Sequence, residues 1–140
     1  MTAAPVADRI HAALMNVVAI ATIGYWVEYF TSGRVKSATD PAYVAFENAF
    51  PLADGYMAVC FLAAARSLRR QRASAVGWGI AAGSAFVFLG AMDTLYNLQH
   101  GKYRERTPEM ALEKAINVVS LTFGPLTMWR VWRARSRLQV

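Results

Sequence analysis

Residues 73–92 read ASAVGWGIAAGSAFVFLGAM, a run of 20 residues without Asp, Glu, Lys or Arg. At about 1.5 Å per residue, a helix of this length spans roughly 30 Å, which is the thickness of the hydrocarbon core of a bilayer. Uncharged runs of this length are typical of membrane-spanning helices. This stretch therefore predicts a transmembrane helix, and the rest of the chain is interpreted around it.

Three further stretches predict spans on the same argument. Residues 10–27 also lack Asp, Glu, Lys and Arg, and residues 43–65 are apolar apart from three side chains. Residues 115–129 become long enough to span if their helix begins near Pro108. The sequence thus predicts an all-α polytopic membrane protein of one domain, residues 1–140. We expect an antiparallel bundle of four transmembrane helices at about 8–31, 41–70, 73–99 and 108–135.

The composition agrees with a membrane protein. Hydrophobic residues make up 56% of the chain against 17% charged residues, and a soluble domain of this size needs more polar surface. The net charge of +6 does not indicate nucleic acid, because the basic residues stand at the ends of apolar runs. Cys60 is the only cysteine, which excludes an intrachain disulfide or a cysteine cluster for zinc. We expect no cofactor and no metal.

The helix boundaries carry capping signals. Asp40–Pro41 and Thr107–Pro108 each place a capping side chain before a proline at the first helical position. Gly33 and Gly101 follow the first and third helices as C-caps. Pro51 falls inside the second helix, where it is expected to remove a backbone donor and free the carbonyl of Glu47.

Small and aromatic residues suggest how the helices are placed. Gly77, Gly79 and Gly83 predict close packing of the third helix against a neighbour. Trp26 and Trp129 stand near helix ends, as interfacial anchors do.

Lys and Arg are divided unequally between the two ends of the predicted bundle. The end that holds both termini carries nine of them and the other end six, whereas eight of the nine acids fall in the other half. Because cytoplasmic ends carry the excess of basic residues, we expect both termini in the cytoplasm. The pattern predicts a multi-pass protein of the plasma membrane, the inner membrane of a bacterium.

Polar side chains gather at the outer end of this bundle. They repeat at spacings of three, four and seven, which place them on one face of each helix. An antiparallel topology then brings the four polar faces to the same end of the bundle. The predicted ligand pocket consists of Tyr25, Glu28, Glu47, Asp54, Asp93, Tyr96, Asn97, Glu113 and Asn117.

Asp54 and Asp93 lie deepest and are the candidate catalytic residues. An ionised carboxylate in hydrocarbon costs at least about 2.5 kcal/mol, so these acids should be paired, hydrated or protonated. Such a group of acids suits binding a cation, stabilising a positively charged ligand or moving a proton. A metal held by His100 with one of the acids is disfavoured, because a single histidine near a loop is a weak signal.

Several functions remain open from the sequence. The first is a pocket for a small amphipathic or lipid-like ligand, hydrophobic or cationic. The second is an enzyme, a membrane-embedded acid–base isomerase or cyclase acting on a lipid. The third is an accessory subunit of a membrane complex or an oligomer. The alternative to all three is structural, because hydrogen bonds between polar side chains also hold membrane helices together. The expected partners are membrane lipid and a small ligand, not nucleic acid.

Three segments resemble small uncharacterised bacterial four-helix membrane proteins. They are FENAFPLAD at residues 46–54, MDTLYNLQHG at residues 92–101 and FGP at residues 123–125. The resemblance covers most of the chain. It implies the four-helix fold but no activity, because that family has no established one.

A weaker resemblance is to the four-helix module of the emopamil-binding sterol isomerases and the sigma-2 receptor. It rests on Glu47 with Pro51 and on Asn117 before Pro125. That family holds cationic amines, and in the isomerases a carbocation-like intermediate, with carboxylates inside the membrane. The resemblance implies a pocket for a hydrophobic ligand.

The distribution of basic residues generates a prediction about orientation. A reporter that is active only in the cytoplasm should be active when fused after Val140, because nine of the 15 Lys and Arg residues lie at that end. A fusion between Gly33 and Asp40, in the first loop at the opposite end, is the control and should be inactive. The reverse pattern would overturn the orientation and move the acidic end to the cytoplasmic leaflet.

Overall fold

The computed structural model describes residues 4–139, so the ends of the expected 1–140 domain lie outside the described residues. The described chain is all-helical, as predicted. Its helices are α1 (Val6–Thr31), α2 (Pro41–Glu47), α3 (Pro51–Arg69), α4 (Ser74–Gln99) and α5 (Pro108–Ala134), with short 3₁₀ helices η1 (Lys102–Arg104) and η2 (Arg135–Arg137). Three stretches are long and apolar enough to cross a membrane: Val6–Thr31, Pro41–Arg69 and Ser74–Gln99.

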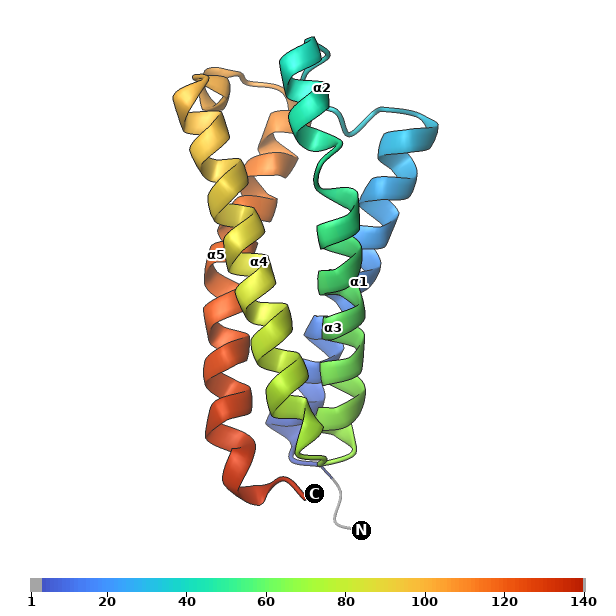
Figure 1. Cartoon of the computed structure of the whole chain (residues 1–140), viewed down its shortest axis with the longest axis vertical. Helices are drawn as coiled ribbons and strands as arrows, with labels where there is room; N and C mark the ends of the chain where they lie inside the picture. Colours follow the sequence, from blue (N-terminus) through green and yellow to red (C-terminus); the bar gives the residue numbers. More distant parts are fainter. Residues whose placement is uncertain (1–3, 140) are drawn as a thin grey trace.

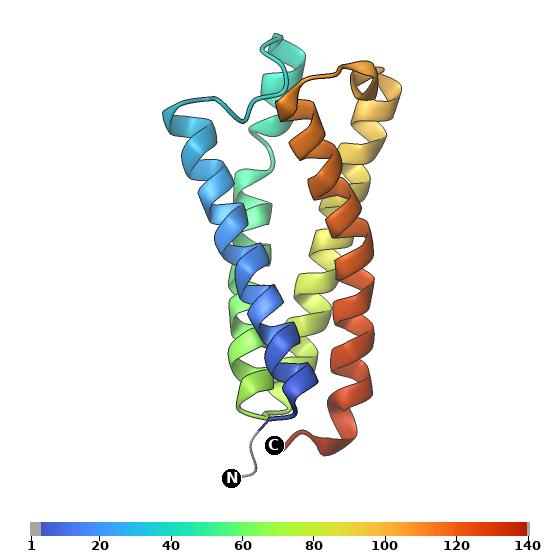
Figure 2. The same cartoon turned by 180° about the vertical axis from the view of Figure 1, so that it is seen from behind.

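The four long helices run alternately up and down (Figure 1). α1 packs along α3, α3 along α4, and α4 along α5. α1 and α5 meet near the end that holds the chain termini, where His11 Nε2 and Thr127 Oγ1 share a hydrogen bond of 3.1 Å. From there the two helices diverge toward the other end of the bundle (Figure 2).

The predicted caps are present. Asp40 Oδ1 accepts a hydrogen bond from the backbone N–H of Tyr43 (3.0 Å), and Thr107 Oγ1 accepts one from Met110 (3.1 Å). Gly33 and Gly101 have φ of 69° and 65°, the left-handed conformation that ends a helix and favours glycine.

The second expected helix, 41–70, is divided in the structure. α2 ends at Glu47, a turn covers residues 48–50, and Pro51 becomes the first residue of α3. Proline has no N–H, so it is tolerated at this first position, where no intrahelical bond is needed. The expectation that Pro51 frees the carbonyl of Glu47 was wrong, because Phe50 N–H donates to it (3.0 Å). The break leaves Glu47 at a helix end with its side chain buried.

The half of the bundle near the termini is packed through small residues. A Cβ on Gly83 would lie 2.6 Å from the carbonyl oxygen of Gly124, and one on Gly79 would lie 2.6 Å from Val131. The backbones of α4 and α5 therefore approach as closely as glycine allows. The expectation for Gly77 was wrong, because it is exposed and a Cβ there would meet nothing within 4 Å.

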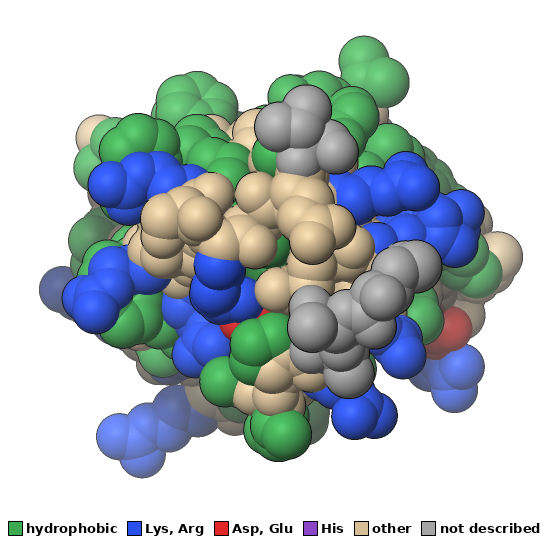
Figure 3. Space-filling view, turned by 90° about the horizontal axis from the view of Figure 1, so that it is seen from below, with side chains coloured by type: hydrophobic (Ala, Val, Ile, Leu, Met, Phe, Trp, Pro, Cys, Tyr) green, Lys and Arg blue, Asp and Glu red, His purple; other side chains and the backbone are tan. Residues whose placement is uncertain are grey.

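At the end that holds the termini, Asp8 is the centre of a charged network. Arg137 donates to both of its carboxylate oxygens (2.5 and 2.9 Å), Gln71 donates to one of them (3.1 Å), and Arg130 lies 3.7 Å away. Gln139 also exchanges backbone hydrogen bonds with Gln71 and Ala73. Viewed from this end, Lys and Arg side chains surround the rim (Figure 3).

The contact between α4 and α5 generates a stability prediction. Gly83→Ala should lower the free energy of unfolding in detergent by about 1–3 kcal/mol, because its Cβ meets a backbone oxygen that cannot move aside. Gly77→Ala is the matched control on the same helix. It should leave stability unchanged or raise it by up to about 1 kcal/mol. Equal effects of the two substitutions in thermal unfolding would contradict this account of the packing.

Candidate functional site

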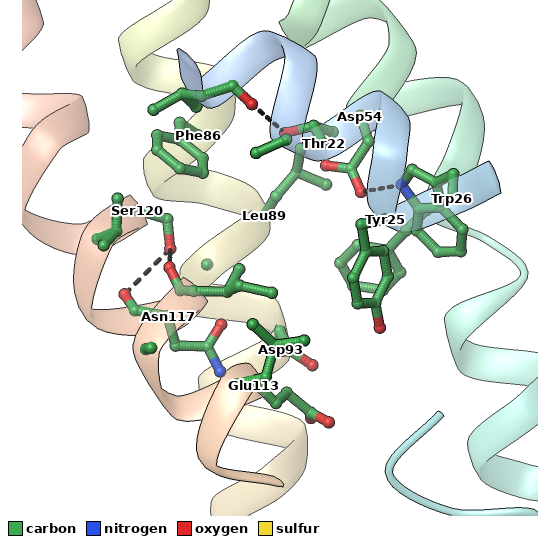
Figure 4. Close-up of a pocket in the computed structure, with 18 of the residues that line it drawn as sticks. Thr22, Tyr25, Trp26, Asp54, Phe86, Leu89, Asp93, Glu113, Asn117 and Ser120 are labelled. Carbon is green, nitrogen blue, oxygen red and sulfur yellow. Dashed lines mark hydrogen bonds between the residues drawn. The ribbon is translucent and has the colours of Figure 1, made fainter. Parts of the chain in front are cut away.

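A cavity of about 580 Å³ lies where α1 and α5 diverge. α1, α3, α4 and α5 all contribute to its wall, as do Glu47 and Phe50 beside the turn between α2 and α3. Most of the wall is apolar, with Phe86 and Leu89 of α4 opposite the side chains of α1 (Figure 4). The polar side chains are concentrated toward the end of the bundle away from the termini.

Three carboxyl groups from three different helices meet in this cavity. Glu47 comes from the end of α2, Asp93 from α4 and Glu113 from the second turn of α5. One carboxyl oxygen from each lies within 4.8 Å of the other two. The residues are buried, with exposed fractions of 6%, 9% and 6%. We call this group the acid cluster.

Asn97 ties two members of the acid cluster together. It follows Asp93 by one helical turn and is completely buried. Its Nδ2 donates to Oε1 of Glu113 (2.5 Å), to Oδ1 of Asp93 (3.2 Å) and to the backbone carbonyl of Asp93 (3.0 Å). Glu113 Oε2 and Asn97 Oδ1 are buried and make no hydrogen bond within the described chain.

Asp54 stands apart from the acid cluster but faces the same cavity. It is half-buried on α3, and its Oδ2 accepts a hydrogen bond from the indole N–H of Trp26 on α1 (2.8 Å; Figure 4). The carboxyl group of Asp54 thus lies on the α1–α3 side of the cavity, apart from the three that meet in the acid cluster.

Of the four remaining predicted site residues, three line the cavity and one does not. Tyr25, Glu28 and Asn117 line the cavity, but the carboxylate of Glu28 pairs with Arg34 (2.7 Å) and with Ser32 beyond the end of α1. Asn117 Nδ2 donates to the hydroxyl of Tyr103 in η1 (2.7 Å). Tyr96 does not line the cavity.

Tyr96 is held by stacking instead. Its ring lies between those of Phe46 and His100, with centroid distances of 4.0 and 4.1 Å. The side chain therefore belongs to the packing between α2 and α4 and not to the cavity wall.

The role of Trp26 was not predicted from the sequence. Its place near a helix end indicated an interfacial anchor, whereas the structure gives its N–H a carboxylate partner. Trp26 follows Thr22 by four residues, and both line the cavity. That spacing on one helix face was the available signal.

The charges around the acid cluster are unbalanced. The four ion pairs of the described residues involve Glu28, Asp40 and Asp8, and none involves a member of the cluster. Asp40 and Lys102 lie outside the three long apolar stretches. The Tyr43 amide and the Lys102 ammonium hold the pKa of Asp40 below its usual range. Asp40 in turn raises the pKa of Lys102. Lys102 is thus already paired with another acid (2.9 Å).

The geometry defines a helical bundle with a mainly apolar cavity and a buried acid cluster at one end. No protein-family model, curated protein or solved structure matches this chain. The chemistry of the side chains must therefore support any functional proposal. Three close acids without a basic partner can hold a cation, accept an ammonium group or share protons.

The position of Asn97 generates a prediction about stability. Asn97→Ala should lower the free energy of unfolding by about 1–3 kcal/mol, because two buried carboxyl groups lose their amide donor. Asn48→Ala is the control, since Asn48 is exposed and only accepts a long hydrogen bond from Tyr29 (3.3 Å). Chemical unfolding in detergent measures both. A loss no larger than that of the control would show that the amide does not stabilise the cluster.

Proposed function

We propose that this protein is a four-span membrane protein that binds a small amphipathic or lipid-like ligand in the cavity. The apolar part of the ligand lies against the wall formed by α1 and α4, and its polar head lies at the acid cluster. One observation carries the proposal: a cavity of about 580 Å³ combines a mainly apolar wall with three buried carboxyl groups. Ligand sites commonly have this combination of apolar lining and a few convergent polar groups.

The outer surface supports placement in a membrane. Large apolar side chains are exposed along α1, where Ile20 is 64% exposed and Val27 57% exposed. They continue along α5, where Val118 is 62% exposed, so we propose α5 as the fourth span. Apolar surface of this extent on a single chain indicates contact with lipid or a partner. The excess of Arg at the other end favours an acidic end in the outer leaflet of a bacterial inner membrane.

The position of the cavity suggests how a ligand enters. Val17 of α1 and Leu112 and Val119 of α5 line it and are 62%, 41% and 43% exposed. They lie on the two helices that diverge, so the opening faces the side of the bundle. In a bilayer this side is in contact with lipid tails, and an amphipathic molecule can enter laterally without passing through water.

Asp54 supports a second candidate, an acid–base isomerase or cyclase acting on a lipid. The carboxyl group of Asp54 lies on the α1–α3 side of the cavity, apart from the acid cluster. One acid could then donate a proton while others stabilise the cation that forms. The inward direction of the cluster gives less support to an accessory subunit, whose carboxylates would face a partner.

A bulky side chain in the cavity wall tests the ligand proposal. Ala115 is small, exposed and part of the wall, whereas Ala111, one turn earlier on α5, is exposed and outside it. We expect Ala115→Trp to weaken binding of a dansyl-labelled long-chain amine in nanodiscs by roughly tenfold or more, because it fills the cavity. Ala111→Trp should bind normally. Equal binding by both variants would contradict the proposal.

The same assay tests the polar head. Asp93→Asn keeps the hydrogen-bonding shape but removes the charge, so it should weaken binding of the amine by about tenfold or more. The matching neutral dansyl amide should bind the variant and the wild type alike. If both probes lose affinity together, the substitution has altered the cavity and not the charge recognition.

A further inference from the structure

We propose that Glu47, Asp93 and Glu113 form a binding site for one divalent metal cation of the hard, oxygen-preferring class, represented by Ca²⁺ and Mn²⁺. This inference goes beyond ligand binding in the cavity and does not depend on it. It differs from the expectation from the sequence that the chain holds no metal. The reason for the difference is that the sequence places the three acids at one end of the bundle but cannot give their separations.

The oxygen separations fit such an ion. Carboxylate oxygens bind Ca²⁺ at about 2.3–2.6 Å, so ligands on adjacent and opposite sides of the ion are roughly 3.3–5.2 Å apart. The three oxygens of the acid cluster lie within 4.8 Å of one another, below the upper end of that range, so one ion can contact all three. Mg²⁺, at about 2.0–2.1 Å, requires a tighter set and keeps several waters.

A second observation comes from the hydrogen bonds. Glu113 is 94% buried, since its exposed fraction is 6%, and its Oε2 has no hydrogen-bond partner within the described chain. Its Oε1 is already used by Asn97. The side chain lies beside Asp93 in the cavity wall (Figure 4), so the carboxyl group that carries this free oxygen is part of the site. A buried carboxylate oxygen without a donor is costly, and a bound cation would satisfy it.

The negative charge of the acid cluster also supports a cation site. The charged groups that act on Glu47 are Asp93, Glu113 and Asp54, all acidic. Three ionised carboxylates carry a charge of −3, and no ion pair of the described chain involves them. A divalent cation would reduce this charge to −1. In a low-dielectric interior, such neutralisation is worth more than in water.

The donor atoms select the class of metal. All three are carboxylate oxygens, which suit Ca²⁺ and Mn²⁺, whereas zinc sites in proteins use mainly His and Cys. His100 is exposed and its Nδ1 contacts the carbonyl of Tyr96, and Cys60 belongs to the apolar core. Neither is a member of the cluster. The coordination positions not filled by protein would face the cavity, where water or a ligand oxygen can complete the shell.

Binding of Mn²⁺ to the full-length protein in nanodiscs tests this site, with electron paramagnetic resonance to count the free ion. We expect one Mn²⁺ per chain, displaced by Ca²⁺. Glu113→Gln should weaken Mn²⁺ binding by about tenfold or more, because it removes one of three anionic ligands. Glu28→Gln is the control and should bind normally, since Glu28 lies on the same cavity but pairs with Arg34.

Two results would contradict the site. The first is no binding of Mn²⁺ to the wild type, and the second is an equal change of Mn²⁺ binding in Glu113→Gln and Glu28→Gln. Protons would then be the species that neutralise the cluster. If Glu113→Gln does not fold, Glu47→Gln serves in its place, because Glu47 contributes one carboxylate and makes no hydrogen bond to Asn97.

The metal and an ammonium head would compete for the same oxygens. Failure of Mn²⁺ to bind, with normal binding of the dansyl amine, would therefore reject the metal and leave the proposed function intact.

Discussion

The contact between the backbones of α4 and α5 at Gly83 and Gly124 is the constraint on which the rest of the bundle depends. A Cβ at either position would meet the other residue's carbonyl oxygen, at 2.6 or 2.7 Å. α4 and α5 also stay close beyond this contact, because a Cβ on Gly90 would clash with Ser120 and Asn97 donates to Glu113. The cavity lies where α1 and α5 separate, so the paired helices α4 and α5 form one firm wall of the open space.

The two halves of the bundle bury different side chains. The half near the termini buries small and apolar side chains such as Ala12 and Ala64, and its buried polar groups Asp8 and His11 are hydrogen-bonded. The half with the cavity buries carboxyl groups and amides. A buried carboxyl group is stable there only with a donor, a cation, a proton or water beside it. The amide of Asn97 supplies a donor to two of the three acids, Asp93 and Glu113, and makes no hydrogen bond to the third, Glu47.

The sequence predicted the all-helical architecture and the capping residues, because each depends on local spacing. The gathering of polar groups at one end followed from that spacing together with the antiparallel topology. Periodicity was less informative at the edges of a helix face. By spacing, Asp93, Tyr96 and Asn97 share one helix face. In the structure, Asn97 donates to the acid cluster. Tyr96 stacks instead with the rings of Phe46 and His100. Helical spacing cannot predict stacking with Phe46, which lies 50 residues away in the sequence.

Two further features depended on tertiary structure. A proline such as Pro51 is compatible either with a kink within one helix or with the start of a new helix, and the structure has the second. That difference matters, because the turn at residues 48–50 allows Glu47 to point inward. The role of Trp26 was also unpredictable from composition, since a tryptophan near a helix end serves as an anchor or as a hydrogen-bond donor equally well.

The network around Asp8 has a consequence for how the protein is made. Arg137 and Asp8 are 129 positions apart, and the pair joins α1 to the segment after α5. As the chain emerges from the ribosome, α1 is complete long before its partner has been synthesised. The carboxylate of Asp8 has no Arg137 beside it during that interval. The bundle is fastened at this end only when the segment after α5 has been made, so assembly finishes with a contact between the earliest and latest parts of the described chain.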